Sequence, residues 1–157
     1  MFPDPGDDSH YPGLPPVISP GCRILILGSY PSIVSLKTRR YYANPRNGFW
    51  TIMDQVLGIP ASLPYDDRIR SVLDQGIGLW DVYASCTRRS SSDATIRDPV
   101  VNSIRELTSI HPRISALFLN GRAAEKGFRV YFPDLIPQGH YLPSSSHAHA
   151  ISLDKKI

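Results

Sequence analysis

Four short apolar runs along the chain predict the strands of a parallel sheet. They are Arg23–Leu27, Ile77–Val82, Ala116–Leu119 and His140–Leu142. The first run contains Ile-Leu-Ile-Leu without a break, as expected of a strand covered on both faces. Helix-like segments separate the runs, and this alternation favours parallel pairing through right-handed crossovers. We therefore expect an α/β domain of three layers, α/β/α, with a central four-stranded parallel sheet.

The helices are predicted from apolar residues at helical spacing and from the breakers around them. The pattern predicts a helix over residues 49–57 closed by Gly58, one capped by Asp66 and ended by Gly76, one opening at Asp98-Pro99, and a short one behind Asn120-Gly121. The stretch from Ser85 to Ile96 is too polar for a core, and we interpret it as a functional or mobile loop.

Length and composition favour one domain preceded by a loosely held arm. A chain of 157 residues can bury a full core. Residues 1–21 hold six prolines and several aspartates, a composition that resists helix and sheet, so we assign residues 22–157 to the domain. Neither a charged leader with an apolar core nor a run of about 18 apolar residues occurs, and we expect a cytoplasmic protein without membrane contact.

Charge and cysteine usage narrow the partners. The net charge is +3, and Lys37, Arg39 and Arg40 lie near the first polar cluster, which favours a polyanion but also fits a solvated surface. Cys22 and Cys86 have neither metal-ligand nor redox spacing. We expect reduced cysteines, no metal or other cofactor, and a monomer.

Each apolar run ends in a polar, turn-forming cluster. These clusters are Gly28-Ser29-Tyr30-Pro31-Ser32, Asp81 with the residues that follow it, Asn120-Gly121-Arg122, and Pro143-Ser144-Ser145-Ser146-His147. The carboxyl ends of parallel strands lie along one edge of a sheet, so the four clusters are expected to meet in one crevice.

The segment at residues 41–50 adds chemistry suited to a nucleotide. Tyr42 offers a ring on which a base could stack, Arg46 can reach a phosphate, and the carboxamides of Asn44 and Asn47 can bind a base edge or a water. Asn47 also precedes a predicted helix, so it could instead be the N-cap of that helix.

The motifs resemble the uracil-DNA glycosylase superfamily, and best its hypoxanthine-DNA glycosylase branch. The resemblance rests on the loop after the first strand, Asn-Pro-Arg-Asn-Gly-Phe-Trp at 44–50, Gly-Ile-Gly-Leu-Trp-Asp at 76–81 and Leu-Pro-Ser-Ser-Ser at 142–146. It implies a base excision repair enzyme that flips a deaminated base, uracil or hypoxanthine, out of damaged DNA and hydrolyses its N-glycosidic bond. No lysine occupies a motif position, so we expect a monofunctional enzyme without lyase chemistry.

The resemblance also implies roles for individual residues. Tyr30 stands where other members carry an Asp or Asn that activates water, and we hypothesise that Asn44 or Asn47 positions the water instead. Asp81 stands at a base-reading position, where an ionised carboxylate would accept from the ring N–H of uracil or hypoxanthine. Alternatively, Asp81 pairs with Arg88 or caps a turn.

The remaining expected contacts fall into two groups. The base-binding residues would be Gly28, Ser29, Tyr30, Tyr42 and Asp81, and the DNA-binding residues would be Arg46, Arg88, Arg89, Ser144, Ser145, Ser146 and His147. Leu142 cannot donate to a leaving base, so His147 or His149 could take that part, unless both are ordinary surface histidines. The rival functions are a catalytically silent nucleic-acid-binding module on the same fold and a small-molecule nucleoside hydrolase.

Overall fold

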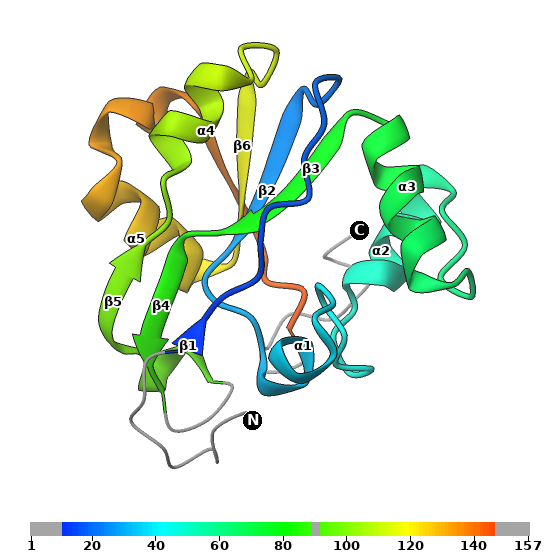
Figure 1. The fold of residues 1–157 in the computed structure, drawn as a ribbon, viewed down its shortest axis with the longest axis horizontal. Coiled ribbons are helices and arrows are strands. Elements are labelled where there is room, and N and C mark those ends of the chain that lie inside the picture. The colour runs from blue at the N-terminus through cyan, green and yellow to red at the C-terminus, as the bar shows by residue number, and fades with distance from the viewer. Residues whose placement is uncertain (1–10, 89–91, 147–157) are drawn as a thin grey trace.

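A parallel four-stranded sheet forms the centre of the molecule (Figure 1). The computed structural model describes residues 11–88 and 92–146. The strand order is β3-β2-β6-β7, with β2 at Ile24–Gly28, β3 at Ile77–Asp81, β6 at Ala116–Asn120 and β7 at Gly139–Leu142. All pairs in this sheet are parallel, so the four predicted strands and their pairing are confirmed.

The register aligns the carboxyl ends of the strands. Gly28 lies opposite Asp81 across β2 and β3, and Asn120 lies opposite Leu142 across β6 and β7. The polar clusters that follow these residues therefore leave the sheet at one edge, as the sequence predicts.

Helices cover both faces of the sheet and complete three layers (Figure 1). One face packs against α4 (Ile104–Ile110) and α5 (Arg122–Tyr131), the other against α2 (Phe49–Leu57) and α3 (Tyr65–Asp74). Strand β2 serves both layers, because Leu25 and Leu27 join the first core and Ile26 the second. The two-sided burial explains its unbroken apolar sequence.

Two predicted helix starts are wrong. Asp66 lies in the first turn of α3 rather than at its cap, because Pro64, with φ fixed at −54°, occupies that position. Asp98-Pro99 belongs to a strand, and α4 begins only at Ile104. Helix α1 (Ile33–Thr38) was not predicted, since its six residues are too few to show a helical period.

A second, three-stranded antiparallel sheet replaces part of the predicted loop. Its order is β1 (Tyr11–Pro12), β4 (Tyr83–Thr87) and β5 (Arg97–Val101). The stretch from Ser85 to Ile96 thus contains the end of β4 and a 3-10 turn, η1, at Asp93–Thr95. Pro99 is tolerated because β5 is an edge strand, and the irregular pairing there accompanies a positive φ of 49° at Asp98.

The described part of the predicted arm, residues 11–21, is packed rather than loosely held. Leu14 is 4% exposed and joins the core, and Val17 forms a bridge with Leu79 on the edge strand β3. The Val17 N–H donates to the Leu79 carbonyl at 2.8 Å, and the Leu79 N–H returns the bond at 2.9 Å. This segment covers an otherwise open sheet edge, which protects the edge from pairing with another chain.

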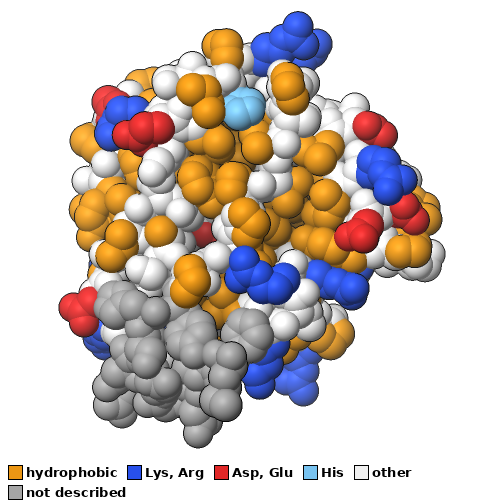
Figure 2. All heavy atoms as spheres, viewed as in Figure 1, with side chains coloured by type: hydrophobic (Ala, Val, Ile, Leu, Met, Phe, Trp, Pro, Cys, Tyr) orange, Lys and Arg blue, Asp and Glu red, His pale blue; other side chains and the backbone are white. Residues whose placement is uncertain are grey.

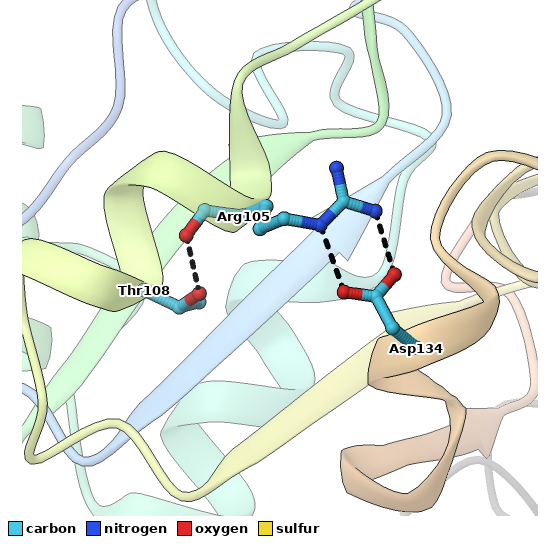
Figure 3. Close-up of polar contacts among 3 residues, drawn as sticks. All are labelled: Arg105, Thr108 and Asp134. Atoms are coloured by element: carbon cyan, nitrogen blue, oxygen red, sulfur yellow. Dashed lines mark hydrogen bonds and ion pairs between the residues drawn. The ribbon is translucent and has the colours of Figure 1, made fainter.

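An ion pair links the outer surfaces of α4 and the 3-10 segment η2 (Pro133–Gln138). Arg105 Nε and Nη2 donate to the two carboxylate oxygens of Asp134 at 2.8 and 2.6 Å (Figure 3). Thr108 Oγ1 donates to the Arg105 carbonyl within the same helix. Both charged side chains are about half exposed, so the pair orients the two segments more than it stabilises the fold.

We expect Leu25→Ala to lower the free energy of unfolding by about 3 kcal/mol, because Leu25 is fully buried in the central strand and its loss leaves a cavity. Urea denaturation measures the change. Val56→Ala on the outside of α2, where Val56 is 52% exposed, should change it by less than about 0.5 kcal/mol. Equal effects at the two positions would contradict the assignment of the core.

Candidate active site

A polar cavity opens at the carboxyl edge of the parallel sheet. It encloses an empty volume of about 610 Å³, part of it continuous with solvent. Ten of the residues predicted for the site line it, namely Gly28, Ser29, Tyr30, Tyr42, Asn44, Asn47, Asp81, Ser144, Ser145 and Ser146. Loops from distant parts of the chain therefore meet here, as expected of strand ends in a parallel sheet.

Asp81 ends strand β3 and turns its carboxyl group into this cavity. The residue is 5% exposed, and burial, reinforced by the charge of Asp93, raises the pKa of its carboxyl to about 7, while Arg88 opposes the shift. Its carboxylate makes no hydrogen bond or ion pair with any residue in the described ranges, so neither the pairing with Arg88 nor the turn cap is present. A buried acid without a protein partner is a strong candidate for binding a ligand.

Gly28 makes room for this carboxyl group. A Cβ at position 28 would lie 2.6 Å from Asp81 Oδ1, which no real side chain tolerates. The absence of a side chain at position 28 therefore allows the acid to lie beside the end of β2.

Tyr42 forms one wall of the cavity. Its ring stacks on Phe49 with the centroids 3.9 Å apart, so Phe49 covers one of its faces. Asn120 Nδ2 donates to its hydroxyl at 3.2 Å, and burial raises the pKa of the phenol, which stays neutral. The wall is thus an aromatic ring in a fixed position.

Tyr30, in the loop after β2, packs against Cys86 of β4 and Leu36 of α1. It is 8% exposed, and burial raises its pKa to about 12, so it cannot act as a base near neutral pH. The guanidinium of Arg88 lies 4.8 Å from the centre of its ring and donates from Nη2 to the Pro31 carbonyl. Arg88 therefore supports the first loop, and its predicted contact with DNA stays a prediction.

Asn44 and Asn47 both use their carboxamide oxygens locally. Asn44 Oδ1 accepts from the Arg46 N–H at 3.0 Å, and Asn47 Oδ1 accepts from the Phe49 N–H at 2.9 Å. Gly48 occupies the N-cap position of α2, so Asn47 helps to satisfy the start of the helix from one residue earlier. Their Nδ2 groups have no partner among the described residues and remain available to a ligand or a water.

Asn120 is a site residue that the sequence marks only as a turn former. Its Oδ1 accepts from the Ser145 N–H, and its Nδ2 donates to Ser145 Oγ, both at 3.0 Å. Ser145 is 4% exposed, and Ser144 Oγ accepts from the Ser146 N–H at 3.1 Å. Asn120 therefore holds the serine loop against the cavity, and its position at the end of a parallel strand was the available signal.

Asp93 is a second acid in the cavity that sequence reasoning missed. Ser29 Oγ donates to Asp93 Oδ1 at 2.5 Å across 64 positions of sequence. Burial raises the pKa of Asp93, and the hydrogen bond from Ser29 and the charge of Arg88 oppose the rise. No apolar periodicity could place this residue, because it follows a polar stretch.

Basic side chains surround the first loop. Figure 2 shows Lys and Arg gathered over and around α1. A second cavity, lined in part by Arg40 and Arg68, adjoins the first through Tyr41, Tyr42 and the two asparagines. Arg46 is exposed beside these cavities without lining either, whereas the predicted contacts Arg89 and His147 lie outside the described residues.

The described part of the chain, residues 11–88 and 92–146, shows neither a metal-type cluster nor a membrane-spanning helix. No three His, Cys, Asp or Glu side chains in these ranges come together in a group that could hold a metal ion. None of the helices there is long and apolar enough to span a membrane. Cys22 and Cys86 are both buried free thiols.

Comparison with known proteins gives consistent matches over nearly the whole chain. Residues 15–156 match the model of the uracil DNA glycosylase superfamily. A protein of Methanosarcina barkeri named hypoxanthine DNA glycosylase is 34% identical over 148 residues, covering 92% of this chain and 91% of its own length. A protein of the same name from Methanosarcina acetivorans is 35% identical over 141 residues, covering 87% of both chains.

A solved structure is also similar. It is the solution NMR structure of a candidate uracil DNA glycosylase from Methanosarcina acetivorans, 33% identical, with a TM-score of 0.77. The similarity covers 89% of this chain and 87% of that one.

We expect the free energy of unfolding to decrease as the pH rises, because of Asp81. The folded state raises the pKa of Asp81 from 3.8 to about 7, so its stabilising contribution is present at low pH and lost as the pH rises through 7. Relative to Asp81→Asn, the free energy of unfolding of the wild type should drop by about 2 kcal/mol between about pH 5 and about pH 8. Urea denaturation at both pH values measures this difference.

Asp74→Asn, at the exposed end of α3, is the matched control and should follow the wild type at both pH values. A difference between wild type and Asp81→Asn that stays constant with pH would contradict the assignment.

Proposed function

Because this chain belongs to the uracil-DNA glycosylase superfamily, we propose that it is a monofunctional DNA glycosylase that flips a deaminated base out of DNA and hydrolyses its N-glycosidic bond. The names of the two Methanosarcina relatives support hypoxanthine as a substrate, and the family name supports uracil. The observation that carries the proposal is the buried carboxyl of Asp81, which lines a polar cavity and has no hydrogen-bond partner among the described residues.

Asp81 gives the cavity a preference among bases. Hypoxanthine and uracil each present a ring N–H, to which an ionised carboxylate can serve as acceptor. Adenine and cytosine present a ring nitrogen lone pair at the corresponding place, and Asp81 would repel it in its ionised form, which predominates above its pKa of about 7. We therefore assign base recognition to Asp81, with Gly28, Ser29 and Tyr42 shaping the space around it.

The asparagines are suited to holding the attacking water. The Arg46 N–H donates to the carboxamide oxygen of Asn44, and the Phe49 N–H donates to that of Asn47. These hydrogen bonds restrain both carboxamides, so each Nδ2 group has a defined direction. Tyr30 is neutral and cannot take this role. We therefore propose that Asn44 or Asn47 positions the water.

The DNA strand would be held by the basic surface and the serine loop. Arg46 and the residues around α1 supply positive charge next to the cavity, and the hydroxyl of Ser144, which accepts from the Ser146 N–H, can still donate to a phosphate oxygen. A small-molecule nucleoside hydrolase would have little use for this charge.

The test of activity is cleavage of oligonucleotides that carry a single uracil, hypoxanthine or xanthine, in single and double strands. We expect alkali-labile abasic sites at uracil or hypoxanthine and none at normal bases. Asn44→Ala or Asn47→Ala, whichever removes the water-positioning group, should lower the single-turnover rate about 100-fold. Gln55→Ala, which removes an exposed carboxamide from α2, is the control. Absence of cleavage on every substrate would contradict the enzyme and favour the catalytically silent nucleic-acid-binding module.

Binding to DNA should weaken steeply with salt, because phosphate contacts release counterions. Fluorescence anisotropy over a salt series gives the slope of log K against log salt. Arg46→Ala should reduce the magnitude of this slope by about 1, and Arg129→Ala, on the exposed side of α5, should leave it unchanged. A slope near zero for the wild type would argue against a DNA partner.

A further inference from the structure

We infer that Asp93 is a further catalytic residue, whose carboxylate accepts a proton from the attacking water in the cavity that holds Asp81. The inference rests on the proposed function and deepens it, because it assigns the base of the reaction. Asp93 comes from η1, an element that contributes none of the residues predicted for the site.

Asp93 lines the same cavity as Asp81 and the two asparagines proposed to position the water. Asp81 is deeply buried, whereas Asp93 is an exposed residue that still lines the same cavity, so Asp93 marks its solvent side. A flipped nucleotide enters such a pocket base first, which leaves its sugar nearer the opening. The reacting carbon of the sugar therefore lies toward Asp93 and the entering water, while the base edge lies toward Asp81.

Ser29 holds the carboxylate in place and leaves half of it free. Ser29 Oγ donates to Oδ1 at 2.5 Å, and no described residue hydrogen-bonds to Oδ2 or forms an ion pair with it. Ser29 is itself buried, at 7% exposure, so the contact is anchored to the first loop beside Gly28. One fixed oxygen and one open oxygen suit a group that must orient a water and accept its proton.

The electrostatic surroundings keep this acid basic enough to work. Although the residue as a whole is exposed, the side chains packed around its carboxyl group exclude part of the solvent and raise the pKa of Asp93, and the hydrogen bond from Ser29 and the charge of Arg88 limit that rise. Within residues 11–88 and 92–146, the titratable and charged side chains that interact with Asp93 are Asp81, Arg88, Tyr42, Tyr83 and Cys86. The tyrosines and the cysteine have raised pKa values and stay neutral, so among these five Arg88 is the cation that balances the two acids.

The step balances with water as the other reactant. The water oxygen forms a bond to the anomeric carbon of the sugar while the C–N bond breaks and its electron pair leaves with the base. The proton of the water passes to Asp93 Oδ2 and then to solvent, and the departing base takes up a proton from solvent. The negative charge of Asp93 also stabilises the positive charge that develops on the sugar.

The experiment compares single-turnover cleavage by the full chain and by Asp93→Asn on duplexes that carry hypoxanthine or uracil. The asparagine retains an oxygen that can accept from Ser29 but cannot take a proton. We expect the rate to fall about 100-fold or more with DNA affinity within about threefold of wild type. Asp98→Asn, an exposed position on the neighbouring edge strand, is the matched control and should cleave at the wild-type rate.

Chemical rescue separates catalysis from structure. Asp93→Ala should be inactive. Added formate should raise the cleavage rate of this variant at least about tenfold over its rate without formate, because a small carboxylate can occupy the vacated space. A wild-type rate in Asp93→Asn, or an inactive Asp93→Ala that formate does not rescue, would overturn the role of Asp93 while leaving the proposed function standing if the wild type cleaves. A wild type that cleaves none of the substrates would overturn both.

Discussion

The position of the Asp81 carboxyl group beside the end of β2 depends on the missing side chain at position 28. Parallel pairing sets Gly28 level with Asp81, and the Val82 N–H donates to the Gly28 carbonyl at 2.8 Å just beyond this point. Any larger residue at position 28 would collide with the acid. The place of the Asp81 carboxyl group in the cavity therefore depends on this steric allowance.

The acid is retained at some cost to the fold. A buried carboxyl without a protein partner loses the solvation that an exposed one keeps, and the raised pKa of Asp81 expresses this loss. The second acid in the cavity, Asp93, increases the loss, and Arg88 relieves part of it from its place over Tyr30. Such an arrangement is unfavourable for stability alone, which is typical of a site shaped by its ligand.

Deeply buried segments could be predicted from the sequence, and partly exposed ones could not. The strands of the central sheet carry unbroken apolar runs because both of their faces are covered, so they stood out in the sequence. Strands β4 and β5 belong to a smaller, partly exposed sheet, and their polar residues and Pro99 resembled a loop and a helix start. The packed segment around Leu14 was missed because prolines dominate its composition.

The residues of the candidate site also differ in whether the sequence predicts them. Residues directly after predicted strands, such as Ser29 and Asp81, could be brought together on paper because strand ends share an edge. Asp93 could not, because its position depends on how the connection between β4 and β5 returns to Ser29, a contact between distant residues that no local pattern encodes. The hydrogen bonds that the carboxamide oxygens of Asn44 and Asn47 accept could not be predicted either, because they depend on local backbone geometry.

Ser145 gives the site an unusual dependence on the order in which the chain folds. Its carbonyl accepts from the Gly48 N–H at 2.9 Å, and its N–H and hydroxyl both bind Asn120. Three loops drawn from across the chain thus share one residue near its C-terminal end. Ser145 follows β7 by three residues, so the loops can close around the cavity only once this last strand of the sheet has paired, and assembly of the site depends on the latest part of the sheet to form.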